Sequence, residues 1–173
     1  MILFLTGTWG AGKSYVADKI VKMWGWPQLD ADVFHTEAHL AAVRANTFHP
    51  DLLDAFYAQL MDQMAEWQRA PERVAQPNFI VTHSVYAERQ RRLIYERFGP
   101  TLRFVLVETP DEALKRTRIQ ERSVWNPVTL AAYEAYLQHW EPMQVPHEVL
   151  INDDELDDHL AQLKTQLLDQ DTT

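Results

Sequence analysis

The sequence predicts an α/β fold in which helices cover both faces of a parallel β-sheet. Five short apolar runs alternate with segments that carry the 3.6-residue spacing of amphipathic helices. Three of the runs are almost continuously apolar, which is typical of parallel strands buried on both faces. Strands and helices in alternation form layered folds with right-handed crossovers. The expected strands are Ile2–Thr6, Gln28–Asp30, Phe79–Thr82, Arg103–Glu108 and Glu148–Ile151.

Two helices are expected before the third strand. The first, Ser14–Trp24, follows the first strand after a short glycine-rich stretch. The second, His49–Trp67, has Pro50 in its first turn, where a helix tolerates proline. Its apolar side chains share one face, which indicates packing on the core, with an exposed docking face as the alternative. They are Leu53, Phe56, Leu60, Met64 and Trp67.

Capping residues mark the later helices. In Thr109–Arg122, Thr109 is the expected N-cap, Glu112 completes a capping box, and a proline occupies the first helical position. An Asn-Pro pair opens the helix expected over Asn126–Trp140. The acidic run at 152–158 is expected to cap and charge the first turn of a last helix.

Composition limits the cofactors and partners. The 173 residues contain no cysteine, which excludes disulfides, thiolate metal sites and cysteine nucleophiles. The formal net charge is −9, so a nucleic-acid partner is not expected. The opening MILFLTG lacks a basic leader, and no run approaches the roughly 18 apolar residues of a membrane span, so a cytoplasmic protein is expected. A monomer and a homodimer both remain open.

The glycine-rich stretch after the first strand carries the most specific motif in the chain. Residues Gly7–Ser14, GTWGAGKS, match the Walker A pattern G-x-x-x-x-G-K-[ST] between a strand and a helix. Glycines let successive backbone N–H groups curl around phosphate oxygens, and the following helix adds its N-terminal dipole. Lys13 is placed to reach the β- and γ-phosphates, and Ser14 to ligate Mg²⁺.

This pattern predicts a nucleoside triphosphate site, with an ordinary tight turn as the alternative. The residues expected to bind the nucleotide are those of the loop and of the first helical turn. They are Gly7, Gly10, Ala11, Gly12, Lys13, Ser14 and Tyr15.

The ends of the next two strands favour phosphoryl transfer over hydrolysis. No acid follows the strand Phe79–Thr82, where hydrolytic ATPases usually carry one, and the guanine-binding tetrapeptide N-K-x-D is absent. Asp30 and Asp32 instead follow the second strand, at the expected edge of the Walker A loop. Transfer to a hydroxyl needs a carboxylate near the acceptor and help in holding hydrated Mg²⁺. Two solvated loop aspartates are the alternative.

With these motifs the chain resembles the small P-loop kinases related to shikimate, gluconate and nucleoside monophosphate kinases. The resemblance rests on the Walker A motif, the D-x-D after the second strand and a later arginine-rich helix, and the segment 79–122 is similar in layout to gluconate kinases. It implies ATP and Mg²⁺. It also implies one three-layer P-loop NTPase domain over residues 1–173, with five parallel strands in the order 2-3-1-4-5. A substrate-binding helical segment at 33–75 and a helical lid at 119–130 complete the implied domain.

The same resemblance implies roles for individual residues. Asp30 matches the acid near the Mg²⁺ shell, and Asp32 matches the acid near the accepting hydroxyl. Arg118 and Arg122 match two lid arginines, the first stacking on adenine and the second contacting phosphates, with Arg116 as a nearby alternative. A lid arginine neutralises charge on the transferring group, so the implied catalytic set is Lys13, Asp32 and Arg122. A solvated helix face is the alternative for the arginines.

The acceptor region departs from the families that the chain resembles. The pattern of gluconate kinases after the D-x-D, rich in Pro, Asp and Arg, is absent, and so is the Gly-Gly pair of shikimate kinases after the third strand. His35 and His39 have an i, i+4 spacing compatible with a metal, but nothing else in the sequence supports a metal cage. The candidates for acceptor binding are His35, Arg44, His83, Arg89 and Arg92.

Three functions fit the sequence. The leading one is an ATP-dependent kinase that phosphorylates a small hydroxyl-bearing metabolite. A nucleotide or polynucleotide 5′ kinase is the second, favoured by the basic cluster RQRRLIYER at 89–97 and opposed by the acidic net charge. A regulatory module that binds ATP without catalysis is the third.

Overall fold

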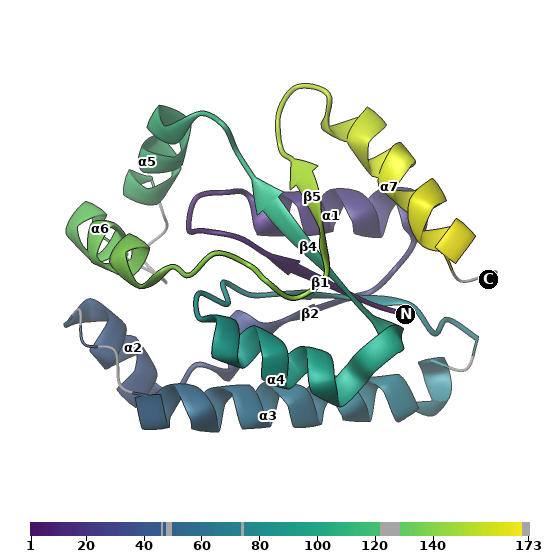
Figure 1. Ribbon diagram of the computed structural model, residues 1–173, viewed down its shortest axis with the longest axis horizontal. Coiled ribbons are helices and arrows are strands. Elements are labelled where there is room, and N and C mark those ends of the chain that lie inside the picture. The colour runs from purple at the N-terminus through teal and green to yellow at the C-terminus, as the bar shows by residue number, and fades with distance from the viewer. Residues whose placement is uncertain (46, 48–49, 74, 122–128, 171–173) are drawn as a thin grey trace.

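Five strands form one parallel sheet in the order β2-β3-β1-β4-β5 (Figure 1). The structure, a computed structural model, describes residues 1–45, 47, 50–73, 75–121 and 129–170. The implied strand order is confirmed, and β4 and β5 each begin one residue earlier than predicted. The strands are β1 (Ile2–Thr6), β2 (Gln28–Asp30), β3 (Phe79–Thr82), β4 (Leu102–Glu108) and β5 (His147–Ile151).

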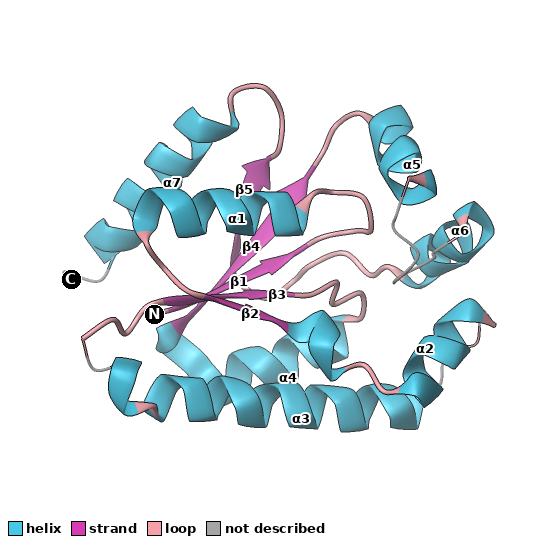
Figure 2. Ribbon diagram, turned by 180° about the vertical axis from the view of Figure 1, so that it is seen from behind, coloured by secondary structure: helices cyan, strands magenta, loops and turns pink. Residues whose placement is uncertain are grey.

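Helices cover both faces of the sheet and one of its ends. Figures 1 and 2 show α1 and α7 on one face, α3 and α4 on the other, and α2, α5 and α6 beyond the end toward which the strands point. The helices are α1 (Lys13–Trp24), α2 (Glu37–Arg44), α3 (Pro50–Arg69), α4 (Glu88–Phe98), α5 (Glu112–Gln120), α6 (Leu130–His139) and α7 (Leu156–Gln170), with the 3₁₀ turns η1 (Ala31–Phe34), η2 (Pro71–Arg73) and η3 (Gly99–Thr101).

Alternation along β1 divides the core into two layers. Ile2 and Phe4 pack with the core side chains of α3 and α4, whereas Leu3 and Leu5 pack with those of α1 and α7. All four side chains are fully buried, and such burial stabilises the fold by roughly 1.5–3 kcal/mol for each large apolar side chain. The predicted stripe of α3 is confirmed as core, because all its members pack into the layer that contains Phe4.

The N-cap predicted for α5 is wrong. The helix begins at Glu112, and the carboxylate of Asp111 accepts a hydrogen bond from the backbone N–H of Leu114 at 3.0 Å. Thr109 lies before the helix, where its buried hydroxyl donates to the carbonyl of Ala11 at 2.9 Å. Because Thr109 is engaged by the Walker A loop, Asp111 caps the helix instead, and aspartate is a preferred N-cap residue.

The helix expected over Asn126–Trp140 begins later than predicted. Thr129 caps α6 by accepting a hydrogen bond from the N–H of Ala132 at 3.1 Å. The Asn-Pro pair lies at residues 126–127, outside the described residues. Among the described helices, none has the length and apolar character needed to cross a membrane.

Candidate active site

The Walker A loop joins the carboxyl end of β1 to α1 and ends at a helix terminus without a side-chain cap. Gly12 precedes α1 with a φ of 86°, in the left-handed region that glycine adopts readily. No side chain caps this terminus, and the backbone N–H groups in the first turn of a helix can bind an anionic ligand. Ser14 and Tyr15, in the first turn, are both exposed.

The loop is held by residues that follow β4 and β5. The carbonyl of Ala11 accepts hydrogen bonds from the Thr109 hydroxyl at 2.9 Å and from the Asn152 amide at 2.8 Å. A Cβ on Gly12 would collide with that amide, and a Cβ on Gly10 would lie 2.8 Å from a backbone carbonyl of α5. The glycines at these two positions are therefore required by close packing as well as by the backbone geometry.

Lys13 folds back over the loop. Its Nζ donates hydrogen bonds to the carbonyls of Gly7 at 2.9 Å and Thr8 at 3.0 Å. Positive charge and hydrogen-bond donors gather at this loop. They come from the ammonium group of Lys13 and from the N-terminus of α1, which has no side-chain cap. This arrangement fits a polyphosphate chain.

The two aspartates of the D-x-D serve different local structures. Asp30 ends β2, and its Oδ1 accepts the backbone N–H of Asp32 at 3.0 Å, which caps the η1 turn. The hydroxyl of Thr82, at the end of β3, lies 3.5 Å from the same oxygen. Asp32 lies within η1 with its side chain 46% exposed, so it faces solvent at the edge of the sheet.

Asp32 is flanked by two histidines. Nδ1 of His83, the residue after β3, lies 3.2 Å from Oδ1 of Asp32, and Nε2 of His35 lies 3.5 Å from the same oxygen. Burial alone would raise the pKa of Asp32, but hydrogen bonds from the two imidazoles lower that pKa well below its ordinary value. Burial lowers the pKa of His83, although Asp32 opposes this shift. A carboxylate beside a neutral His83 is therefore the favoured state near neutral pH.

Aromatic side chains of α3 hold the histidine rings. His35 stacks on Phe56 with a centroid distance of 4.6 Å and an interplanar angle of 19°. The ring of His83 lies 4.7 Å from that of Phe56 and 5.7 Å from that of Tyr57, which it meets edge to face. The segment 33–75, expected to bind substrate, thus places aromatic side chains of α3 next to the two histidines that contact Asp32.

The two arginines of α5 have different partners. Nη1 of Arg118 donates to the carbonyl of Gly10 at 3.1 Å, so this side chain lies on the Walker A loop. Arg116 instead forms an ion pair with Glu134 of α6 at 3.0 Å. Arg122, and residues 122–128 of the predicted lid, lie outside the described residues.

The exposed acceptor candidates do not gather around Asp32. Arg89 pairs with Asp54 across α3 and α4 at 2.7 Å, and its side chain is 61% exposed. Arg92 donates to the side-chain oxygen of Gln144 at 2.9 Å. Arg44 lies in α2, and its side chain is not among the described parts of the chain. Of the acceptor candidates, the structure brings His35 and His83 to Asp32.

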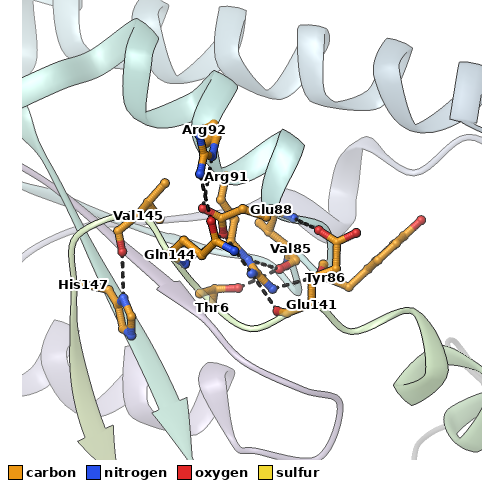
Figure 3. Close-up of polar contacts among 10 residues, drawn as sticks. All are labelled: Thr6, Val85, Tyr86, Glu88, Arg91, Arg92, Glu141, Gln144, Val145 and His147. Carbon is orange, nitrogen blue, oxygen red and sulfur yellow. Dashed lines mark hydrogen bonds and ion pairs between the residues drawn. The ribbon is translucent and has the colours of Figure 1, made fainter.

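The basic cluster at 89–97 includes an arginine in the protein interior. Arg91 is fully buried and donates to the backbone carbonyls of Val85, Tyr86 and Glu141 at 2.8–2.9 Å (Figure 3). Its Nη1 also pairs with Glu88 at 3.2 Å. This arginine therefore ties α4 to the segment before β5 and is not part of a surface for polyanions.

Two residues at the loop were not assigned a role from sequence. Trp9, within the Walker A motif, stacks on Tyr136 of α6, with ring centroids 4.2 Å apart and planes inclined by 8°. Asn152 supports Ala11 from the end of β5. An asparagine directly after a predicted strand could have been proposed from sequence as a residue at the functional edge of the sheet. The contact between Trp9 and α6 could not, because no pattern near either residue indicates it.

Comparisons with known proteins identify the fold. No protein-family model matches the sequence, and no curated protein matches it. Solved structures do: a sugar kinase from Janibacter sp. HTCC2649 is 20% identical with a TM-score of 0.72, covering 97% of this chain and 94% of its own. A gluconokinase from Sinorhizobium meliloti 1021 is 19% identical with a TM-score of 0.70, covering 97% and 95%. A Thermus thermophilus protein is 20% identical with a TM-score of 0.59, covering 98% and 97%.

The chain therefore has the fold of the P-loop small-molecule kinases. The strand order and the position of the Walker A loop after β1 agree with this fold. Because folds of this kind host several reactions, the reaction has to be argued from the site.

Proposed function

We propose that the protein is a kinase that transfers the γ-phosphoryl group of ATP to a hydroxyl of a small metabolite. One observation carries the proposal: the anion site built around Lys13 and the carboxylate of Asp32 meet at the same edge of the sheet. The strand that leads into the loop, β1, pairs in parallel with β3, and the backbone N–H of His83, directly after β3, donates to the carbonyl of Leu5 at 3.2 Å. The side chain of His83 in turn contacts Asp32. A phosphate donor and a hydroxyl acceptor would thus be held side by side.

The donor atoms near the loop fit a magnesium ion. Mg²⁺ prefers oxygen ligands, keeps several waters, and is bound through one or two protein oxygens together with substrate phosphates. Ser14 offers an exposed hydroxyl, and Asp30 has Oδ1 engaged by the N–H of Asp32, which leaves Oδ2 for a hydrated cation. These two residues would hold the ion, which would neutralise phosphate charge and orient the nucleotide.

Each protein group then has a defined task. Lys13 and the first N–H groups of α1 would bind the phosphates, and Arg118, which donates to the carbonyl of Gly10, would contact the nucleotide. Asp32 accepts a hydrogen bond from the acceptor hydroxyl and aligns it for in-line attack on the γ-phosphorus. ADP leaves as the new O–P bond forms, and the hydroxyl proton passes to Asp32 late in the transfer. A low carboxylate pKa suits this orienting role, because a loose phosphoryl-transfer transition state demands little proton abstraction early in the reaction. Arg122 of the lid is proposed to contact the transferring group.

An acceptor screen tests the proposal. Tag-free protein with Mg-ATP is assayed for coupled ADP release with sugars, polyols, sugar acids, nucleosides and nucleoside monophosphates, and the product is identified by ³¹P NMR. We expect one chemical class to stimulate release, and Lys13→Met, the control for contaminating kinases, to abolish it. Tight Mg-ATP binding without stimulation by any acceptor would instead leave a nucleotide-binding module and refute the kinase.

A further inference from the structure

Three side chains at the edge of the sheet have the geometry of a transition-metal site. Asp32, His35 and His83 each offer one ligand atom, and these atoms lie within 4.8 Å of one another. The two nitrogen–oxygen separations at Asp32 are 3.2 Å to His83 and 3.5 Å to His35. Two ligands of a tetrahedral zinc ion, each about 2.0–2.2 Å from the metal, lie roughly 3.3–3.6 Å apart. Both measured separations are therefore close to those of a metal-bound pair.

The surrounding structure presents these atoms in fixed orientations. Packing on Phe56 and Tyr57 of α3 restrains both imidazole rings. The backbone N–H of His35, the C-cap of η1, donates to the carbonyl of Asp32 at 3.3 Å, which fixes the spacing of the two residues. Because Asp32 remains 46% exposed, an ion can enter from solvent on its open side.

We propose that Asp32, His35 and His83 bind one divalent transition-metal ion, with zinc as the best match, at a site separate from that of Mg²⁺. Two imidazoles and one carboxylate suit zinc and cobalt, whereas Mg²⁺ prefers an all-oxygen set. Three protein ligands leave a fourth position for water. The proposed metal partners of His35 are Asp32, three residues earlier at the same turn, and His83, which follows β3.

The consequence for catalysis rests on the proposed kinase function. Asp32 is the carboxylate proposed to align the acceptor hydroxyl, and a metal ion bound to it removes that hydrogen-bond acceptor. Zinc is then a reversible inhibitor that competes with the acceptor and leaves nucleotide binding unchanged.

Cobalt absorption measures binding without any enzymatic readout. Tag-free wild-type protein is titrated with Co²⁺ alone at pH 7.5, without nucleotide, and zinc is then added to displace it. We expect a visible d–d band that saturates at one equivalent and disappears with zinc. The variants His83→Gln and His35→Gln should each weaken Co²⁺ binding at least tenfold. His159→Gln is the control, because that histidine pairs with Asp153 at 3.6 Å and belongs to no group of three candidate metal ligands among the described residues.

Each outcome decides the proposal. Circular dichroism shows that a variant is folded, and His35→Gln, at the end of the short η1 turn, keeps the test valid if His83→Gln does not fold. No band in the wild type, or equal weakening by His159→Gln, overturns the site. Saturable cobalt binding in a protein that phosphorylates no acceptor supports the metal site and refutes the kinase, so the two failures are distinguishable.

Discussion

Trp9 and Tyr136 stack face to face, with ring centroids 4.2 Å apart and planes inclined by only 8°. The pair joins the Walker A loop to α6, the described helix that follows the predicted lid. The same layer contains Tyr86, whose ring meets Tyr136 edge to face at 5.8 Å. The phosphate loop is therefore packed against a helix more than 100 residues away in the chain.

A double-mutant cycle should detect this contact. Trp9→Ala and Tyr136→Ala are expected to show a coupling free energy of about 0.5–1.5 kcal/mol in the free energy of unfolding, because stacked aromatic pairs contribute that much beyond their buried area. Urea denaturation of the four proteins measures it. Trp9→Ala combined with Trp24→Ala is the control, since Trp24 packs on Trp26, and its effects should add. Additivity at Trp9 and Tyr136 would contradict the structural pairing.

Gly12→Ala should abolish nucleotide binding. The new Cβ would collide with the buried amide of Asn152 and displace the group that holds Ala11. Gly99→Ala is a matched control, because Gly99 also has a positive φ, of 50°, but its Cβ would meet no atom within 4 Å. That control should lose about 1–3 kcal/mol of stability from backbone strain and still bind Mg-ATP. Calorimetric titration with Mg-ATP compares the two, and equal affinities would be inconsistent with the loop described.

Asp32→Asn should separate nucleotide binding from transfer. Mg-ATP affinity should stay within about threefold of wild type, because Lys13 and the helix terminus are intact, while turnover falls by roughly 10²–10⁴. Coupled ADP release and calorimetry measure the two quantities. Asp62→Asn, at an exposed ion pair with Arg97, should leave both unchanged. Wild-type turnover in Asp32→Asn would remove this residue from the mechanism.

Arg91→Met should be far more destabilising than Arg89→Met. The first removes a fully buried guanidinium from three carbonyls and from Glu88, for an expected loss of about 3–5 kcal/mol. The second removes an exposed ion pair with Asp54, for an expected loss of at most about 1 kcal/mol. Urea denaturation at neutral pH measures the difference. Similar losses would mean that the interior network contributes little.

Tyr133 should make the fold sensitive to alkali. Burial, reinforced by the charge of Glu112, raises the pKa of Tyr133 to about 12, whereas the unfolded chain ionises near its ordinary value of about 10. Between these values the unfolded state binds fewer protons, so the free energy of unfolding falls as the pH rises from about 10 to about 12. Tyr133→Phe should show a shallower fall. Urea midpoints of the wild type and of Tyr133→Phe at pH 9 and pH 11 provide the comparison. Equal losses of stability in the two proteins would contradict the raised pKa of Tyr133.

The fold was largely predictable because its signals are local. Continuous apolar runs, amphipathic spacing and a Walker A motif each lie within a few residues, and together they define the strands and the loop. Contacts between residues distant in the sequence were not predictable. Asp32 and His83 were both candidates, but their meeting depends on the parallel pairing of Asp30 with Thr82, which places two distant loops side by side. In the same way, Thr109 was wrongly predicted as an N-cap because capping patterns consider only neighbouring residues, whereas its hydroxyl donates to the distant carbonyl of Ala11.

The support of Ala11 by Thr109 and Asn152 means that the Walker A loop is held by residues far away along the chain. Synthesis runs from the amino to the carboxyl end, so the glycine-rich segment is made before its two braces, which follow 98 and 141 positions later. The hydrogen bonds that hold Ala11 in place are therefore complete only after β5 and the residue that follows it have been made.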